Sequence, residues 1–269
     1  MKQLRKQLLY IGLLLLSTVL IWTIWGNTAL VLTHCAVRSE KLPPAFQGFT
    51  IAQVSDLHNT QFGTDNQKLL AMLKNARPDM IAITGDLLDS RNTDPETVIA
   101  FVTEAVTIAP VYYIPGNHES RIPNVYAEVK QVLTTLGVVI LENRSIILEQ
   151  DGQQLCLTGL TDPDFNIPWP DLTSEAYQVV LSHRPELIDL YAQSGFDLVL
   201  TGHAHGGQFR LPFIGGLYAP HQGFLPEYDS GIHKQGDTVM VVSRGLGNSL
   251  FPLRFNNRPE LILITLESI

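Results

Sequence analysis

Five short polar motifs, each placed where a hydrophobic run ends, constrain the fold of this 269-residue chain more than any other feature. A short hydrophobic run that stops at a polar cluster is typical of a buried strand. Polar residues that follow neighbouring parallel strands meet at one edge of the sheet, so motifs far apart in sequence can converge. The motifs are Asp56-Leu57-His58, Gly85-Asp86-Leu87-Leu88-Asp89, Gly116-Asn117-His118-Glu119, Ser182-His183 and Gly202-His203-Ala204-His205.

The residue types in these motifs are metal ligands. Asp and Asn supply oxygen and His supplies imidazole nitrogen, a mixture that suits Mn, Fe or Zn better than Ca or Mg. The set is large enough for two divalent ions about 3.5–4 Å apart, the arrangement that produces a nucleophilic hydroxide. We therefore predict two divalent metal ions as cofactors and phosphoester hydrolysis as the reaction.

Strand and helix signals alternate in the first half of the domain, which predicts a largely parallel sheet. Strands are predicted at 49–54, 80–84 and 111–114, with helices at 67–76 and 95–108 between them. Later strands are predicted at 138–142, 145–148, 154–160, 178–181, 198–201, 239–243 and 260–266. Closely spaced strands after the helical part indicate a second sheet packed on the first.

The N-terminal segment is apolar. Residues Leu8 to Trp25 carry no charge, and this run approaches the roughly 20 residues that cross a bilayer. It is longer than the ~7–15 residue core of a signal peptide, and no cleavage pattern of small residues follows closely. We predict an uncleaved membrane anchor at 1–34, a linker at 35–47 and a catalytic domain at 48–269.

The basic residues on either side of the apolar run predict how the chain is oriented in the membrane. Lys2, Arg5 and Lys6 precede the apolar run, against Arg38 and Lys41 after it. This bias predicts a single-pass protein of the cell membrane, with its N-terminus inside and its catalytic domain outside the cytoplasm.

The net charge is −8, and the residues after the first 34 carry −11. Such a surface repels nucleic acid, so we expect no nucleic-acid recruitment.

In order and spacing, the motifs between residues 50 and 206 resemble those of the calcineurin-like metallophosphoesterase superfamily. The extension Gly206-Gly207-Gln208-Phe209-Arg210 resembles a bacterial membrane-associated or exported branch of it. The resemblance implies an α/β fold of two packed mixed β-sheets flanked by helices, here preceded by one transmembrane helix. It also implies that Asp56, His58 and His205 hold one metal, that Asn117, His183 and His203 hold the other, and that Asp86 bridges them.

The resemblance further implies a mechanism. A metal-bound hydroxide would attack phosphorus in line, His118 would protonate the leaving oxygen as general acid, and Asp89 would hold the imidazole in orientation. The alternative for Asp89 is that it only caps the segment that follows. Members that act as protein phosphatases place an arginine directly after this aspartate, whereas Ser90 stands here and Arg91 follows it. This difference argues against a phosphoprotein substrate.

The motifs leave the substrate open between a phosphodiester, a pyrophosphate and a monoester, in a phosphorylated small molecule or a lipid-linked compound. The alternative function is a non-catalytic, metal-binding scaffold of the same fold. Such members usually lose ligands, and here every expected ligand and the proton donor are present.

Residues outside the motifs give weaker signals. The arginines at 210, 244 and 254 are candidates to clamp a phosphate, but each fits an ordinary ion pair better. The histidines at 34, 221 and 233 lack a motif, so we expect surface or loop positions. The stretch from Leu211 to Leu225 is rich in apolar and aromatic residues. It could line a groove that faces the membrane, but we expect its side chains to pack onto the second sheet.

Overall fold

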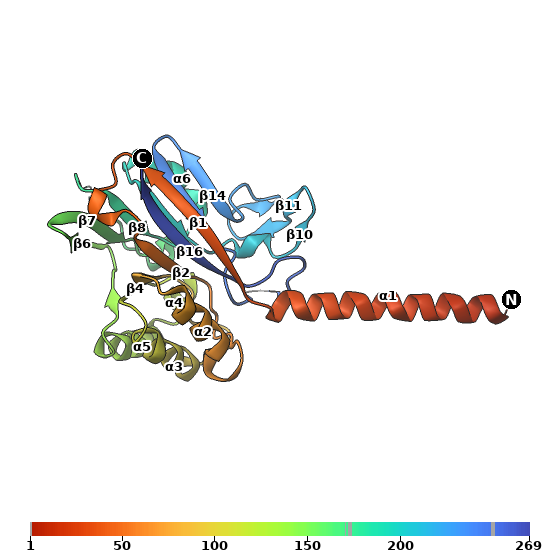
Figure 1. Cartoon of the computed structure of the whole chain (residues 1–269). Coiled ribbons are helices and arrows are strands. Elements are labelled where there is room, and N and C mark those ends of the chain that lie inside the picture. Colours follow the sequence, from red (N-terminus) through yellow and green to blue (C-terminus); the bar gives the residue numbers. More distant parts are fainter. Residues whose placement is uncertain (1, 170, 172–173, 249–250) are drawn as a thin grey trace.

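A computed structural model of the chain describes residues 2–169, 171, 174–248 and 251–269. Two six-stranded mixed sheets pack face to face, helices cover their outer faces, and one long helix extends away from the domain (Figure 1). The predicted fold class, two packed mixed sheets flanked by helices after an N-terminal apolar helix, is confirmed.

The first sheet carries three of the five motifs. Its order is β1-β16-β2-β3-β4-β5. Strands β2 to β5 are parallel, whereas β16 is antiparallel to β2 and parallel to β1. The strands are β1 (Val31–Ser39), β2 (Thr50–Val54), β3 (Met80–Thr84), β4 (Val111–Ile114), β5 (Val139–Ile140) and β16 (Glu260–Ser268).

The second sheet carries the two histidine motifs. Its order is β14-β15-β9-β8-β7-β6, in which the four central strands are parallel and both edge strands are antiparallel to their neighbours. The strands are β6 (Arg144–Gln150), β7 (Gln153–Gly159), β8 (Gln178–Leu181), β9 (Leu198–Thr201), β14 (Gly231–Gln235) and β15 (Thr238–Val242).

The core has three parts because each sheet has two apolar faces to cover. Ile51 and Leu200 belong to the buried cluster between the sheets. On the outer face of the first sheet, Ile83 packs with side chains of three helices, and on the outer face of the second sheet Tyr191 packs on β8 and β9. The helices of the domain are α2 (Gln67–Ala76), α3 (Pro95–Ala105), α4 (Asn117–Ser120), α5 (Pro123–Thr135) and α6 (Ile188–Gln193).

Strand β1 lies where the sequence predicts the end of the anchor and the start of a linker. Its residues pair in register with β16, from Val31 opposite Glu260 to Ser39 opposite Ser268. The rest of the predicted linker holds a short 3-10 turn whose Phe46 is buried. The sequence of β1 gives little indication of a strand, because its side chains are only partly buried and its partner strand lies more than 220 residues away. The division of the chain into anchor, linker and catalytic domain stays a prediction.

Helix α1 (Lys2–Thr28) extends away from the domain (Figure 1). Its segment from Gln3 to Thr28 is apolar and long enough to cross a membrane, and the most apolar part of it is unburied. At 1.5 Å per residue it measures about 39 Å, against a bilayer core of about 30 Å. Only two residues separate α1 from β1, so the domain lies directly against whatever surrounds the end of this helix.

Two small hairpins follow the last histidine motif and form what we call the hairpin lobe, residues 210–225. They consist of β10 (Arg210–Leu211), β11 (Gly215–Gly216), β12 (Tyr218–Ala219) and β13 (Gly223–Phe224). The prediction that the apolar side chains of this stretch pack onto the second sheet is wrong for several of them. Ala219 is buried against that sheet, but Phe213 and Phe224 are 108% and 84% exposed. Two-residue strands in tight hairpins are too short to turn a continuous apolar face inward.

Candidate metal centre

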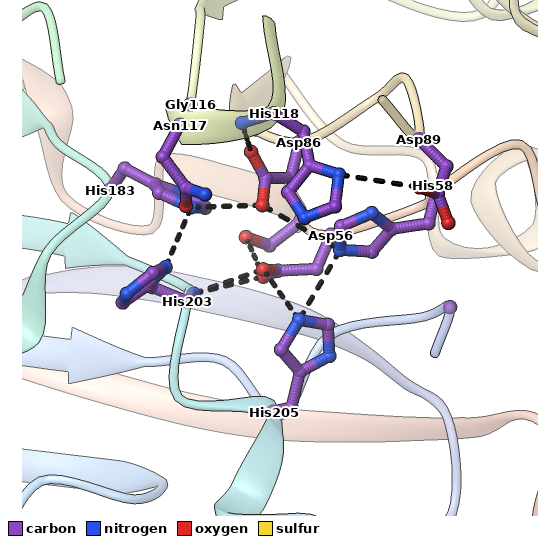
Figure 2. A network of polar contacts seen from close by, with 12 residues as sticks. Asp56, His58, Asp86, Asp89, Gly116, Asn117, His118, His183, His203 and His205 are labelled. Atoms are coloured by element: carbon purple, nitrogen blue, oxygen red, sulfur yellow. Dashed lines mark hydrogen bonds and ion pairs between the residues drawn. The ribbon is translucent and has the colours of Figure 1, made fainter. Parts of the chain in front are cut away.

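The five motifs lie at one edge of the two packed sheets, in the loops that follow strands. Two of them follow the parallel neighbours β2 and β3, and a third, which follows β4, forms the short helix α4. The other two follow β8 and β9, which are also parallel neighbours. Figure 2 shows that their side chains point toward a common centre. Loops at the carboxyl ends of parallel strands are the usual place for a ligand in an α/β fold.

One group of side chains in this centre consists of Asp56, His58 and His205. The Nε2 atoms of His58 and His205 lie 3.2 Å apart, and His205 Nε2 is 3.4 Å from Asp56 Oδ1. All three side chains are buried. One nitrogen or oxygen from each of them lies within 4.8 Å of the other two, which is the spacing of ligands around one ion.

A second group consists of Asn117, His183 and His203. His183 Nε2 lies 3.2 Å from Asn117 Oδ1 and 3.2 Å from His203 Nδ1. The amide oxygen of Asn117 therefore faces an imidazole nitrogen. Turning the amide around would let its NH2 group donate to both imidazoles and its oxygen accept from Arg121. An oxygen held inward beside these nitrogens suits a cation, whereas the turned amide suits an empty centre.

Asp86 joins the two groups. Its Oδ2 lies 3.6 Å from His58 Nε2 in the first group and 3.3 Å from His183 Nε2 in the second. Its Oδ1 accepts a hydrogen bond of 2.8 Å from the backbone N–H of His118. One carboxylate thus faces both groups and is held in place by the motif after β4 (Figure 2).

The donor set fits cations in both places. Two imidazole nitrogens that face each other at 3.2 Å need a proton or a cation between them, since each otherwise presents a lone pair. Buried carboxylates also need a counter-charge, because the protein interior solvates them poorly. Imidazole nitrogen with carboxylate and amide oxygen is a ligand set typical of Mn, Fe or Zn.

Burial holds most of these imidazoles neutral, which is the form that binds metal. Burial lowers the pKa of His58 to about 3 and holds the pKa values of His203 and His205 well below the usual range. His183 differs: burial also opposes its charge, but the nearby Asp86 carboxylate outweighs burial and raises its pKa to about 10. The carboxylate of Asp86, 3.3 Å from His183 Nε2, therefore favours positive charge at this position.

The sequence model of the calcineurin-like phosphoesterase family matches residues 49–207, which span all five motifs. The chain belongs to this family. The phosphoesterase is 30% identical over 246 residues to the metallophosphoesterase YkuE of Bacillus subtilis, a match that covers 88% of this chain and 85% of that one. It is 28% identical over 224 residues to the phosphodiesterase YaeI of Escherichia coli, covering 81% and 82%.

Two further comparisons concern membrane association and the fold. A transmembrane protein with a metallophosphoesterase domain from Bos taurus is 26% identical over 262 residues, covering 88% of this chain and 57% of that protein. The 5'-nucleotidase precursor of Thermus thermophilus superposes with a TM-score of 0.50 at 15% identity, covering 81% of this chain and 54% of that one. The structural likeness shows the fold alone. Membership of the family makes the chain a metal-dependent phosphoesterase, a hydrolase.

Five of the seven candidate ligands of the phosphoesterase lie on strained backbone. Asp56, His58, Asp86, His203 and His205 all have φ between 47° and 65°. This left-handed conformation costs an L-residue about 1–2 kcal/mol, and such residues gather at functional sites. Nothing in the order of residue types reveals this strain.

Two motif glycines are required because a carboxylate approaches their backbone closely. A Cβ on Gly116 would lie 2.3 Å from Asp86 Oδ1, and a Cβ on Gly202 would lie 2.2 Å from Asp56 Oδ2. Both distances are far shorter than a van der Waals contact. These glycines therefore let the backbone of one motif touch the carboxylate of another.

Glu119 is part of the site, although no role was predicted for it from the sequence. Its carboxylate is buried and accepts from the backbone N–H groups of Asp86 at 3.0 Å, Gly116 at 2.8 Å and Leu88 at 2.9 Å. Burial, with the charge of Asp86, raises its pKa to about 7. Glu119 thus ties the loop after β3 to the start of α4. Its place three residues after the N-cap of a helix is a capping-box signal that could have indicated this role.

His118 and Asp89 lie together beside the centre. His118 is buried, and its Nδ1 is 3.4 Å from Asp89 Oδ1. Ser90 is as close, with its backbone N–H 3.1 Å and its Oγ 3.2 Å from the same nitrogen. Arg91 donates to both oxygens of Asp89. The pKa of His118 is lowered, because burial outweighs the nearby carboxylates.

His221 contacts the centre, although we expected an ordinary surface or loop position. It lies in the turn between β12 and β13, with Nδ1 2.8 Å from His203 Nε2 and 2.7 Å from Arg184 NH1. Arg184 donates to His221 Nδ1, and the Nε2–H of His203 can share that acceptor, which leaves Nδ1 of His203 to face the centre. The turn is not part of any motif, so its approach to His203 follows only from the folding of the lobe.

His34 and His233 lie in the edge strands β1 and β14, as expected for surface residues.

The three arginines considered as phosphate clamps have partners of their own. Arg210 pairs with Asp229 at 2.9 Å, and Arg244 pairs with Glu260 at 2.7 Å. Arg254 is buried and donates to backbone carbonyl groups and to an asparagine side chain. Arg210 and Arg244 thus form ordinary ion pairs, as expected from the sequence.

Proposed function

We propose that this phosphoesterase is a membrane-anchored enzyme that hydrolyses phosphodiester bonds at a centre of two divalent cations. The position of Asp86 carries the proposal, because one carboxylate oxygen faces a ligand nitrogen of each group, at 3.6 Å and 3.3 Å. A shared carboxylate is what a binuclear site needs to hold two ions close together. The similarity to the phosphodiesterase YaeI supports a diester over a monoester.

The residues of this chain would divide the work as follows. Asp56, His58 and His205 would hold one ion, Asn117, His183 and His203 would hold the other, and Asp86 would contact both. Bound Mn, Fe or Zn ions would supply activated water and positive charge for the phosphoryl oxygens. Glu119 and the motif glycines keep these ligands in place through the backbone contacts described above.

His118 is the proposed general acid. Its charged form would give the Nε2 proton to the leaving oxygen and keep a proton on Nδ1. In the neutral ring, Nδ1 accepts from the backbone N–H of Ser90 at 3.1 Å. Once protonated, Nδ1 would instead donate to Asp89 Oδ1, 3.4 Å away, or to Ser90 Oγ at 3.2 Å. Asp89 would thus orient the imidazole, but the serine hydroxyl shares this task.

Helix α1 is proposed as the membrane anchor, with the catalytic domain outside the cytoplasm. Its apolar length and the similarity to transmembrane relatives support the span, and the compact basic residues before it support the orientation. A phosphorylated small molecule or lipid-linked compound of the cell envelope is then the expected substrate class. Protease treatment of intact cells checks the orientation. Cleavage of the catalytic domain is expected, and full protection would show that the domain lies in the cytoplasm.

The decisive experiment combines metal analysis with activity in the full-length chain. In detergent with Mn²⁺ we expect about two metal ions per chain and faster hydrolysis of bis(4-nitrophenyl) phosphate than of 4-nitrophenyl phosphate. The Asp86→Asn variant should lose metal and activity together. A faster monoester reaction would replace the diester proposal. Bound metal without turnover of either compound would support the non-catalytic scaffold instead.

A further inference from the structure

The hairpin lobe exposes large apolar side chains that no part of the described chain covers. Phe213, at the tip of the first hairpin, is 108% exposed. It also adopts a φ of 66°, and Leu225 a φ of 54°, a conformation that bulky residues rarely take. Soluble surfaces seldom present several such side chains together. The exposed large apolar residues of the lobe are Leu211, Phe213, Ile214, Tyr218, Phe224 and Leu225.

The lobe is tied to the end of helix α1. Asn27, in the last turn of α1, donates to the carbonyl oxygen of Arg254 at 2.9 Å and accepts from its backbone N–H at 2.7 Å. Next to it, the guanidinium of Arg258 lies 4.6 Å from the ring centre of Trp25. These contacts fix the direction in which α1 leaves the domain.

The same C-terminal segment holds the base of the lobe. Arg210 in β10 donates its backbone N–H to the carbonyl oxygen of Phe255 at 3.0 Å. Gln208 donates to the carbonyl oxygens of Phe251 at 2.9 Å and Leu253 at 2.6 Å. The lobe and α1 thus share one support. Figure 1 shows β10 and β11 on the side of the domain from which α1 extends.

We propose that the hairpin lobe is a membrane-docking surface that inserts Phe213, Ile214 and Phe224 into the interface of the bilayer that α1 spans. This rests on the proposed role of α1 as an anchor. The two-residue connection to β1 holds the domain against that bilayer. The domain carries net negative charge, so apolar insertion rather than attraction to anionic head groups would drive the contact.

Docking would bring the metal centre to the membrane surface. The second hairpin carries exposed Phe224 in β13 and, in the turn before it, His221, whose Nδ1 is 2.8 Å from His203 Nε2. One short hairpin therefore connects the proposed lipid contact with a candidate metal ligand. A phosphate at the level of the lipid head groups is the substrate position that this arrangement favours.

The test uses the full-length chain with a nitroxide label at Phe213→Cys, in vesicles of phosphatidylcholine and phosphatidylglycerol. Collision of the label with oxygen, which concentrates in lipid, is compared with collision with a water-soluble nickel chelate. The matched control is Ile147→Cys, since Ile147 is 50% exposed on β6, far from α1 (Figure 1). The unsubstituted chain controls for labelling, because Cys156 is buried and burial raises the pKa of Cys35 to about 11.

We expect the label at 213 to collide often with oxygen and several-fold less with nickel than the label at 147. Equal nickel collision at both positions, in protein that floats with the vesicles, would overturn docking and leave the anchor intact. Shielding from both reagents would also overturn it, by showing contact with protein. Protein that fails to float with the vesicles would refute the anchor as well. Ile214→Cys repeats the measurement, and turnover of bis(4-nitrophenyl) phosphate within about twofold of the unsubstituted chain shows that each labelled protein is folded.

Discussion

Replacing His118 by Asn tests whether this side chain transfers a proton or holds a metal. The backbone N–H of residue 118 would still donate to Asp86 Oδ1, at 2.8 Å in the structure, so the carboxylate shared by the two ligand groups stays in place. The Asn oxygen can also accept from the backbone N–H of Ser90, as His118 Nδ1 does at 3.1 Å. Only proton transfer is then lost, which costs about 10²–10⁴-fold in rate, or about 3–5 kcal/mol.

The competing reading is that His118 is itself a ligand, since its ring lies close to His58 and Asp86. Two measurements distinguish a general acid from a metal ligand: the metal content of the variant, and its rates on substrates with different leaving groups. Hydrolysis of a diester with an alkoxide leaving group should fall by the full factor in His118→Asn. Hydrolysis of bis(4-nitrophenyl) phosphate should fall little, because nitrophenolate leaves without a proton. Equal losses for both substrates, or loss of metal, would refute the general-acid role.

Three further predictions concern the surroundings of the centre. Gly116→Ala places a Cβ 2.3 Å from Asp86 Oδ1, so it should lower metal content and destabilise the fold by roughly 1–3 kcal/mol, measured by metal analysis and thermal unfolding. His221→Ala removes the partner of His203 Nε2 and should weaken metal affinity about 10–100-fold, measured by competition with a chelator. Burial opposes the charge of Glu260, but its arginine partner outweighs burial and lowers the pKa below 4.5. Its contribution to stability should therefore be lost as the pH falls below 4.5 through the lower folded value, and Glu260→Gln should remove that part of the pH dependence of unfolding.

Local sequence pattern predicts the parts of the fold that depend on neighbours along the chain. The predicted helix 67–76 and the strands 80–84 and 111–114 have the same bounds as α2, β3 and β4. The helix shows the helical period, the two strands are short continuous apolar runs, and a Gly or Pro follows each element within two residues. Helix α5 was not predicted, although Tyr126, Val129 and Leu133 follow the helical period and are buried on one face.

Contacts between distant segments explain what the sequence could not predict. Strand β1 exists through its pairing with β16, at the other end of the chain. His221 reaches His203 only through the folding of two hairpins, and Glu119 binds a loop that starts at Asp86. A single sequence carries no signal of such proximity. The candidate ligands are different, because each follows a strand whose own pattern is visible.

The strained and buried ligands of the centre are expected to keep their arrangement more stably when a cation is bound. Asp56 and Asp86 are buried in a setting where burial raises the pKa of Asp56 to about 6, and both lie on left-handed backbone. Without a cation, the fold would have to bear this strain and the cost of burying the carboxylates, with only partial compensation from His183 and from the buried guanidinium of Arg254. A bound cation offsets that cost in the folded chain alone, so metal binding should stabilise folding as well as supply the chemistry. The same dependence explains why a variant such as Asp86→Asn should lose metal from both groups rather than from one.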